Sequence, residues 1–357
     1  RDGAAFAAGL RSALESEGVF VWQDVIQLPR VVGQEWWKRI TDGIDRVNYL
    51  IMVLTPAAFE RETVLQEWRY ARRTGVCVIP VKASPEVDIQ ALPRWMRKVQ
   101  FAHLGYTSTL EAFRAHDDGQ AWNGFVGQIF SPCEKPDYAF MVDKNDFYVP
   151  RAALSGQVID LLLDREQKAP RAITSALRGA GGFGKTTLAR AICFDDAVQD
   201  AFSDGILWVT LGESATMDTV RVKLNALIEA KTHQRSDRDF ESAKTRLREL
   251  LDGQEVLIVI DDVWKREHLE PFLRLGDHLT TLITTRMEDV LPHIAQRIPI
   301  AGMECAEAAA LIGYRFSDEE KQAHAAEFRT LAERLGEYAL LLKLANGTLH
   351  DRVRAGE

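Results

Sequence analysis

Two hydrophobic patterns alternate along the first third of the chain. Short continuous apolar runs such as "YLIMVL" (49–54) are separated by segments such as "AAFAAGLRSALESEG" (4–18), in which apolar residues recur every three or four positions. Continuous apolar runs are typical of strands buried on both faces of a parallel sheet, and the longer period is typical of helices. The pattern therefore predicts a doubly wound α/β domain over residues 1–130. Its expected strands are VFVWQDV (19–25), YLIMVLT (49–55), VCVIPVKA (76–83) and a short one near VQFAHL (99–104).

A second alternating unit follows a stretch at 131–150 that holds three prolines and has no helical period. This stretch predicts a linker that ends in a docking strand. Residues 151–300 predict a second parallel sheet of five strands with helices between them, and residues 301–357 predict a small all-helical subdomain. The main strands of the second sheet are expected at AITSALRG (172–179), GILWVTLG (205–212), EVLIVIDDVW (255–264) and HLTTLITTR (278–286).

Composition narrows the class of protein. The 357 residues are 46% hydrophobic and 27% charged, which indicates two or three folded domains, and the net charge of -8 argues against nucleic-acid binding by bulk electrostatics. The apolar runs are too short to span a bilayer, so no membrane contact is expected. The four cysteines form no C-x-x-C pair, which favours neither a zinc site nor a disulfide framework and suits the cytoplasm. They are Cys77, Cys133, Cys193 and Cys305.

The stretch "RGAGGFGKTTLAR" (178–190) carries the first candidate chemistry. Its glycine spacing matches a phosphate-binding loop, in which backbone N–H groups and a helix N-terminus hold a polyphosphate. Lys185 is expected to neutralise the β and γ phosphates, and the Thr186 hydroxyl to ligate Mg²⁺. The candidate nucleotide-binding residues here are Gly179, Gly181, Gly182, Gly184, Lys185, Thr186 and Thr187.

Polar residues end two later strands of the same predicted sheet. Asp261 is the candidate Mg²⁺ ligand and Asp262 the candidate for polarising an attacking water. Arg286 follows Thr284 and Thr285, where it can sense a γ-phosphate. Each residue alone also suits a solvated strand end, but their order after the glycine loop favours the nucleotide site.

These motifs resemble the NB-ARC module of the STAND ATPases, the class that includes plant disease-resistance receptors and apoptosome-forming proteins. The matching elements are "YVPRAAL" (148–154), the glycine loop, "VLIVIDDVW", "LITTR" and "LAERLGEYALLL" (331–342). The resemblance implies ATP or ADP as ligand and adds Val149, Arg151 and Ala339 to its binding residues. Ala339 stands where the family has the proline of its Gly-Leu-Pro-Leu element, which departs from the pattern near the adenine.

The first domain is similar to a flavodoxin-like TIR domain of the bacterial type. The segments that carry this resemblance are "VFVWQDVIQLP", "YLIMVLTPAAF" and "VLQEWRYARRTGVCVIPV". A phosphoacceptor receiver domain is a weak alternative because "YLIMVLTP" ends without an aspartate. The family's first strand would precede Arg1, and the chain stops without a closing element, so we expect further structure beyond both ends.

Many TIR domains hydrolyse NAD⁺ with one glutamate on the helix after the family's third strand. That strand corresponds to YLIMVLT (49–55) here, and the glutamate to Glu67. Val64, Trp68 and Ala71 share one helical face and are expected to meet the sheet, with Glu67 at the edge of that stripe. No lysine or arginine lies three or four residues from Glu67. A carboxylate there can stabilise the oxocarbenium-like state of nicotinamide release. Asp24 is a weaker candidate for orienting substrate, since a strand-end turn also explains it.

Two functional hypotheses follow from the resemblances. In the first, the ATPase module is a switch and the TIR domain an NAD⁺-cleaving effector, with self-association through both domains and a trigger read by a repeat-built sensor. In the second, the TIR domain only recruits other TIR domains. Glu67 separates them because a scaffold does not need it. A metabolic P-loop enzyme is disfavoured because no substrate domain is visible.

Overall fold

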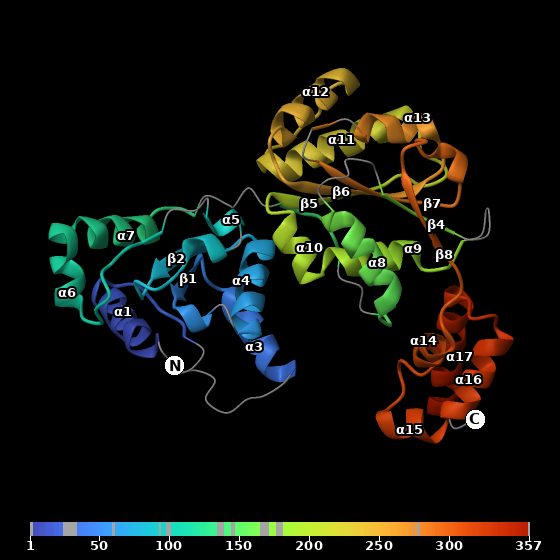
Figure 1. Cartoon of the computed structure of the whole chain (residues 1–357), viewed down its shortest axis with the longest axis horizontal. Helices are drawn as coiled ribbons and strands as arrows, with labels where there is room; N and C mark the ends of the chain where they lie inside the picture. Colours follow the sequence, from blue (N-terminus) through green and yellow to red (C-terminus); the bar gives the residue numbers. More distant parts are fainter. Residues whose placement is uncertain are drawn as a thin grey trace. The chain divides into compact units, whose positions relative to one another are not determined.

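The computed structural model of the chain divides into two compact units, Arg1–Phe140 and Met141–Glu357, which are described separately (Figure 1). The structure describes residues 3–23, 34–58, 61–92, 94–97, 101–133, 139–143, 147–164, 171–175, 181–273, 275–276 and 279–355.

Strands β1 (Tyr49–Leu54) and β2 (Cys77–Lys82) pair in parallel at the centre of the first unit. Ala102 adds an isolated parallel bridge to Val81, at the place of the expected short strand. The helices of this unit are α1 (Ala4–Ser16), α3 (Gln34–Ile44), α4 (Glu62–Thr74), α5 (Arg94–Arg97), α6 (Leu110–Ala115) and α7 (Gln120–Phe130), with 3-10 turns at Pro56–Ala58, Ile89–Ala91 and His116–Gly119.

Alternate side chains of β1 enter two different cores. Tyr49, Ile51 and Val53 pack with α1, α6 and α7, whereas Met52 and Leu54 pack with Trp68 of α4. Successive residues of a strand point to opposite faces of its sheet. The sheet is therefore covered on both faces, as its continuous apolar strands predicted.

The strand expected at 19–25 is absent from the described part of that segment, residues 19–23. Residues 19–23 and β1 line a common cavity of about 470 Å³, and these residues belong to no strand. Val19 and Val21 still pack, half-buried, against the core of α1. The apolar pattern therefore reports their burial and not a hydrogen-bonded strand.

A disulfide joins Cys77 and Cys133, so the expectation that the cysteines form no disulfide is wrong. Their Cα atoms are 6.1 Å apart although 56 positions separate them in sequence. Cys77 starts β2, and the chain after α7 returns to this same end of the sheet. The Tyr49 hydroxyl also donates to the Ser131 carbonyl at 2.9 Å, which ties the returning segment to β1.

The second unit is built on a sheet with the order β3-β5-β6-β7-β4-β8 in the described part of the chain, and the strands β4 to β8 pair in parallel. Five strands were expected, and the sixth, β3, comes from the linker. Because β7 lies between β4 and β6, its carboxyl end faces both the glycine loop that follows β4 and the two aspartates that end β6. The strands are β3 (Ala139–Phe140), β4 (Arg171–Ser175), β5 (Gly205–Thr210), β6 (Val256–Val263), β7 (Thr280–Thr285) and β8 (Gln296–Ile300).

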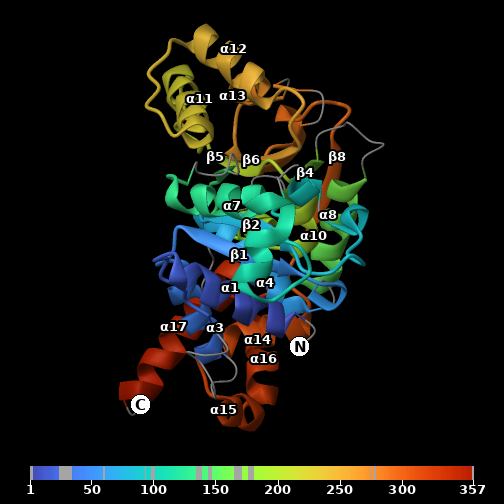
Figure 2. The same ribbon diagram turned by 90° about the vertical axis from the view of Figure 1, so that its left-hand side faces the viewer.

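Helices cover both faces of this sheet (Figures 1 and 2). One face carries α8 (Ala152–Leu163), α9 (Lys185–Cys193) and α10 (Asp196–Ala201), and the other α11 (Met217–Thr232), α12 (Phe240–Leu251) and α13 (Arg266–Leu269). The glycine loop is followed by two helices, α9 and α10, and not by one continuous helix. Asp195 separates them because its side chain accepts hydrogen bonds from Ala197 N–H and Val198 N–H, which starts a new helix.

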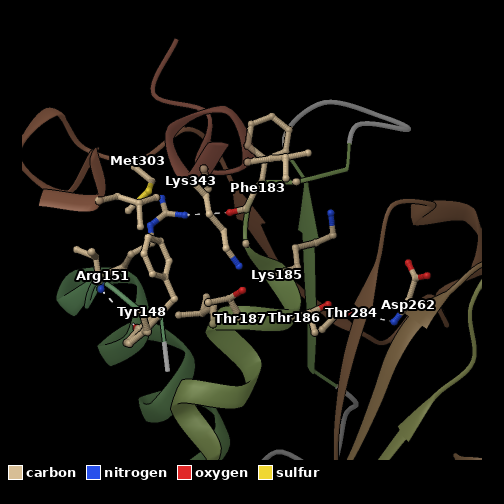
Figure 3. Close-up of a pocket in the computed structure, with 18 of the residues that line it drawn as sticks. Tyr148, Arg151, Phe183, Lys185, Thr186, Thr187, Asp262, Thr284, Met303 and Lys343 are labelled. Carbon is tan, nitrogen blue, oxygen red and sulfur yellow. Dashed lines mark hydrogen bonds between the residues drawn. The ribbon is translucent and has the colours of Figure 1, made fainter. Parts of the chain in front are cut away.

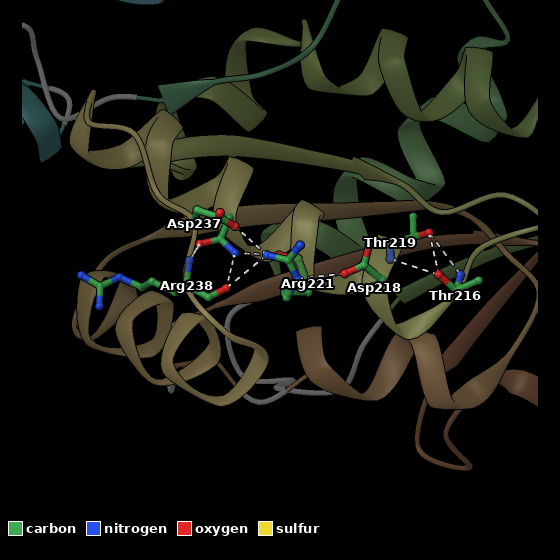
Figure 4. Close-up of polar contacts among 7 residues, drawn as sticks. Thr216, Asp218, Thr219, Arg221, Asp237 and Arg238 are labelled. Atoms are coloured by element: carbon green, nitrogen blue, oxygen red, sulfur yellow. Dashed lines mark hydrogen bonds and ion pairs between the residues drawn. The ribbon is translucent and has the colours of Figure 1, made fainter.

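Polar side chains hold the loop between α11 and α12 (Figure 4). The Arg221 guanidinium pairs with Asp218 at 2.9 Å and with Asp237 at 2.7 Å, and Asn225 donates to the Arg238 carbonyl at 2.9 Å. The two ion pairs are solvent-exposed and contribute little stability on their own. The buried Asn225 amide replaces backbone hydrogen bonds that the loop lacks.

The chain ends in a helical subdomain with its own core. Phe316, Phe328 and Leu342 are buried in it, and Phe147 and Val149, which precede α8, pack against the same core. The segment that leads into the sheet unit therefore also touches the helical subdomain. Its helices are α14 (Cys305–Ile312), α15 (Asp318–Ala323), α16 (Ala325–Arg334) and α17 (Ala339–Ala355).

Candidate functional site

The glycine loop leads directly into the N-terminus of α9. Gly182 and Gly184 have φ values of 85° and 87°, in the left-handed region that side chains disfavour. A Cβ on Gly181 would overlap the Arg286 guanidinium, and one on Gly182 would overlap the Tyr338 hydroxyl. The loop is glycine-rich because of its conformation and because other side chains press against it. The predicted Gly179 lies outside the described residues.

Lys185 is the first residue of α9 and is only 8% exposed. Burial lowers the pKa of its ammonium, and the Arg286 guanidinium lowers it further, while Asp262 and Asp261 oppose the shift. A buried cation beside another cation is stabilised by an anion placed between them. The lysine side chain extends over the cavity shown in Figure 3.

Phosphate binding at this lysine is expected to depend on pH. The pKa of Lys185 is lowered in the free protein, and a bound phosphate raises it. The affinity for phosphate is therefore highest below the pKa of the free protein, and it falls as the pH rises from that pKa to the pKa of the complex. We expect the dissociation constant for ADP to increase as the pH rises from below the lowered pKa of Lys185 toward the ordinary lysine value. Calorimetric titration across this range measures it. Lys185→Arg stays charged and should flatten the profile; identical profiles for the two proteins would contradict the assignment.

The Asp261 carboxylate accepts hydrogen bonds from hydroxyl groups on three elements. It accepts from Thr186 at 2.7 Å, from Thr284 at 2.6 Å and from Thr210 at 3.4 Å. These threonines lie on α9, β7 and β5 respectively, and Asp261 itself is 3% exposed. A buried carboxylate held by three donors is fixed in position, as a metal-orienting group must be.

Asp262 lies at an irregularity in the β6–β7 ladder, where the register shifts between Ile260 and Val263. Its φ of 53° is in the left-handed region, and its N–H donates to the Thr284 hydroxyl at 2.9 Å. Bulges of this kind turn a side chain out of the strand pattern. The Asp262 carboxylate consequently faces Arg286, with 3.8 Å between Oδ1 and Nε.

The oxygen atoms of Thr186 and Asp261 suit Mg²⁺. Hard oxygen ligands are what this ion prefers, and it is usually held by one or two carboxylates together with substrate phosphates. The 2.7 Å contact shows that the two side chains already converge on one point. They would hold the ion against a phosphate on the glycine loop, and the ion would neutralise phosphate charge.

The glycine loop forms one wall of a cavity of about 270 Å³, and the helical subdomain forms another. The candidate phosphate-binding residues Lys185, Thr186 and Thr187 line this cavity. The predicted Val149 and Ala339 also line the cavity, together with Phe147, Met303 and Leu311, which supply an apolar surface suited to a nucleobase.

Arg151 lines the cavity but is held by the protein itself. Its guanidinium donates to Glu307 at 3.3 Å, to the Gly302 carbonyl at 2.8 Å and to the Phe183 carbonyl at 3.5 Å. These partners lie on α14, on the segment before α14 and on the glycine loop. Arg151 therefore joins the helical subdomain to the loop, whatever further contact it makes with a ligand.

Two family models match the chain. The TIR domain matches residues 1–116, and the NB-ARC domain matches residues 152–307. The chain carries a TIR domain followed by an NB-ARC domain.

Curated proteins similar to the chain include plant disease resistance proteins. The chain is 28% identical over 158 residues to "Probable disease resistance protein RXW24L" of Arabidopsis thaliana. The aligned segment covers 43% of this chain and 17% of that protein. It is 30% identical over 142 residues to "Disease resistance protein RGA2" of Solanum bulbocastanum, which covers 38% of this chain and 14% of that protein. The chain thus spans less than a fifth of the length of these relatives.

Among solved structures, the chain is similar to a Signal Transduction ATPase with Numerous Domains protein with a tetratricopeptide repeat sensor from Pyrococcus horikoshii. The identity is 16%, the TM-score is 0.37, and the match covers 58% of this chain and 31% of that chain. No helix in the described part of the chain is both long and apolar enough to cross a membrane.

Glu67 of the TIR domain lies on α4 and is half-buried. Its neighbours Trp68 and Ala71 are buried and Val64 packs in the same core as Trp68, so the predicted core face of this helix is confirmed. The predicted Asp24 lies outside the described residues.

Thr210, Tyr338 and Lys343 are among the residues of the site that went unpredicted. Thr210 is the last residue of β5 and lies beside Asp261. The carboxyl ends of all strands in a parallel sheet lie at the same edge, so this position could have been expected. Tyr338 lies against the glycine loop, and Lys343 lines the cavity on the same face of α17 as Ala339. Spacing of four residues on a predicted helix would have suggested Lys343.

Proposed function

We propose that this chain is a nucleotide-switched signalling protein whose NB-ARC domain binds ATP or ADP with Mg²⁺ and whose TIR domain cleaves NAD⁺. The names of the plant relatives support a role in immunity, and we place the protein in the cytoplasm. The segments quoted above favour a TIR domain of the bacterial type and hence a defence role such as a response to phage.

The observation that carries the switch is the construction of the nucleotide cavity. The Leu340 N–H, at the start of α17, donates to the Gly182 carbonyl of the glycine loop at 3.1 Å. A nucleotide in the cavity touches the sheet and the helical subdomain at once. Any ligand that fits one arrangement of these parts better than another shifts the balance between them.

The size of the required shift argues for a second input. Moving a two-state equilibrium from about 1:99 to 99:1 needs about 5.5 kcal/mol of differential binding. The contact that distinguishes ATP from ADP is a γ-phosphate at Arg286, and one charge-assisted hydrogen bond supplies about 1.5–3 kcal/mol. ATP is therefore necessary but not sufficient, and a trigger sensed outside these domains adds the remainder.

Glu67 is proposed as the catalytic residue of the TIR domain. Cleavage breaks the bond between ribose C1′ and the nicotinamide nitrogen; the bonding pair leaves with nicotinamide, and the carboxylate stabilises the cationic sugar. Water then adds to C1′ and loses a proton, which gives ADP-ribose, while attack by an adenine nitrogen of the same molecule gives a cyclic product. We propose that neighbouring TIR domains complete each site, so that activity requires self-association.

Size-exclusion chromatography combined with a nicotinamide assay tests this function. The full-length protein is loaded with ADP or with a non-hydrolysable ATP analogue, and each fraction is assayed with NAD⁺. We expect activity in oligomeric fractions formed with the ATP analogue and none in ADP-loaded monomers. Full activity in a monomer regardless of nucleotide would refute the switch. Oligomers that release no nicotinamide would favour the alternative in which the TIR domain only recruits other TIR domains.

A further inference from the structure

The helix that closes the cavity begins directly on the glycine loop. Besides the Leu340–Gly182 hydrogen bond, the Tyr338 ring packs edge-on against Phe183 with 4.9 Å between centroids. These contacts fix the first turn of α17 over the loop. Residues three or four positions further on must share this face of the helix.

Lys343 is the residue at that spacing, four after Ala339 and three after Leu340. All three line the cavity, and Figure 3 shows the Lys343 side chain extending into it. The Lys343 ammonium lies 5.3 Å from the centre of the Phe147 ring. The side chain therefore reaches from α17 toward the apolar wall that precedes α8.

The charge balance of the cavity distinguishes Lys343 from the two arginines that line it. Arg151 has Glu307 as a partner, and Arg286 has Asp262. Among the described residues no carboxylate oxygen lies within ion-pair distance of the Lys343 ammonium. A cation that extends into a ligand cavity over an aromatic ring, without a carboxylate partner, suits an anionic ligand group.

We propose that Lys343 binds the α-phosphate of the nucleotide from the helical subdomain. Lys185 and the N-terminus of α9 are placed for the outer phosphates, and the wall around Phe147 suits the base. Lys343 lies against this wall and lines the same cavity as Lys185, and the anionic group of a nucleotide that lies between base and β-phosphate is the α-phosphate. This inference rests on the proposed nucleotide binding.

Affinities for ATP, ADP, AMP and adenosine test the assignment, measured on the full chain by calorimetry and by competition against ADP. Lys343→Gln is expected to weaken ATP, ADP and AMP alike, each about tenfold, and to leave adenosine unchanged, because only adenosine lacks the α-phosphate. Lys343→Arg should bind all four as the wild type does. Lys321→Gln on α15, whose lysine pairs with Asp318, is the matched control.

Each other outcome is decisive. Equal affinities for wild type and Lys343→Gln, a loss shared by adenosine, or a loss confined to ATP and ADP would overturn the α-phosphate assignment while leaving nucleotide binding intact. A wild-type protein that binds neither ATP nor ADP would overturn the proposed function itself.

Discussion

Replacing Lys185 with alanine is expected to empty the nucleotide site. The side chain is buried at the N-terminus of α9 and its pKa is lowered by burial, so its positive charge is costly in the free protein and is stabilised when a phosphate binds. Loss of a charge-assisted contact in such a site, with the desolvated phosphate left without its partner, costs about 3 kcal/mol, or about a hundredfold in affinity. Nucleotide released from purified, denatured protein and calorimetric titration with ADP measure the effect.

Lys321→Ala serves as the control for this substitution because the lysine is solvent-exposed on α15, away from the cavity. The Lys185 variant should also keep the thermal stability of the ligand-free wild type, since it removes a poorly solvated charge and not an ion pair. Retention of ADP by Lys185→Ala at wild-type stoichiometry would exclude this loop as the phosphate site.

The phosphate end of the cavity could be predicted from sequence because its residues lie at the ends of strands in one parallel sheet. All carboxyl ends of such a sheet meet at one edge, so a glycine loop after one strand and two aspartates after another must lie near each other. The structure gives the detail that patterns do not: Thr186 donates to Asp261, and a register shift turns Asp262 toward Arg286.

The other wall of the cavity could not be derived this way. Tyr338 and Lys343 lie more than 150 positions after the glycine loop, and only the packing of the helical subdomain brings them to it. The Cys77–Cys133 disulfide could not be predicted for the same reason, because it depends on where α7 ends relative to β2. Sequence periodicity reports which face of an element is buried but not which distant element covers it.

The segment at 19–25 shows a related limit. Its apolar residues predict a strand, and a strand needs a neighbour for its backbone hydrogen bonds. Residues 19–23 form no strand, and they line a cavity together with β1. For α4, by contrast, the prediction depended only on its own helical spacing, and Trp68 and Ala71 are buried as expected.

That spacing also positions the residue with the largest expected effect on the proposed enzymatic activity. Glu67→Gln is expected to reduce nicotinamide release from NAD⁺ by about 100-fold to 1,000-fold, because the amide keeps the size of the side chain but removes the charge that stabilises the cationic sugar. ATP binding and folding should persist, since Glu67 lies on α4 of the TIR domain and no described residue of the nucleotide cavity belongs to that domain.

Glu62→Gln is the matched control for Glu67→Gln. Glu62 begins the same helix, its side chain is 62% exposed, and its loss removes the same charge from α4. Both variants are assayed in the assembled full-length protein, with oligomeric state checked by size-exclusion chromatography. Glu62→Gln should cleave NAD⁺ at the wild-type rate. If Glu67→Gln does so as well, Glu67 has no catalytic role; if the assembled wild type releases no nicotinamide at all, the TIR domain acts by recruitment.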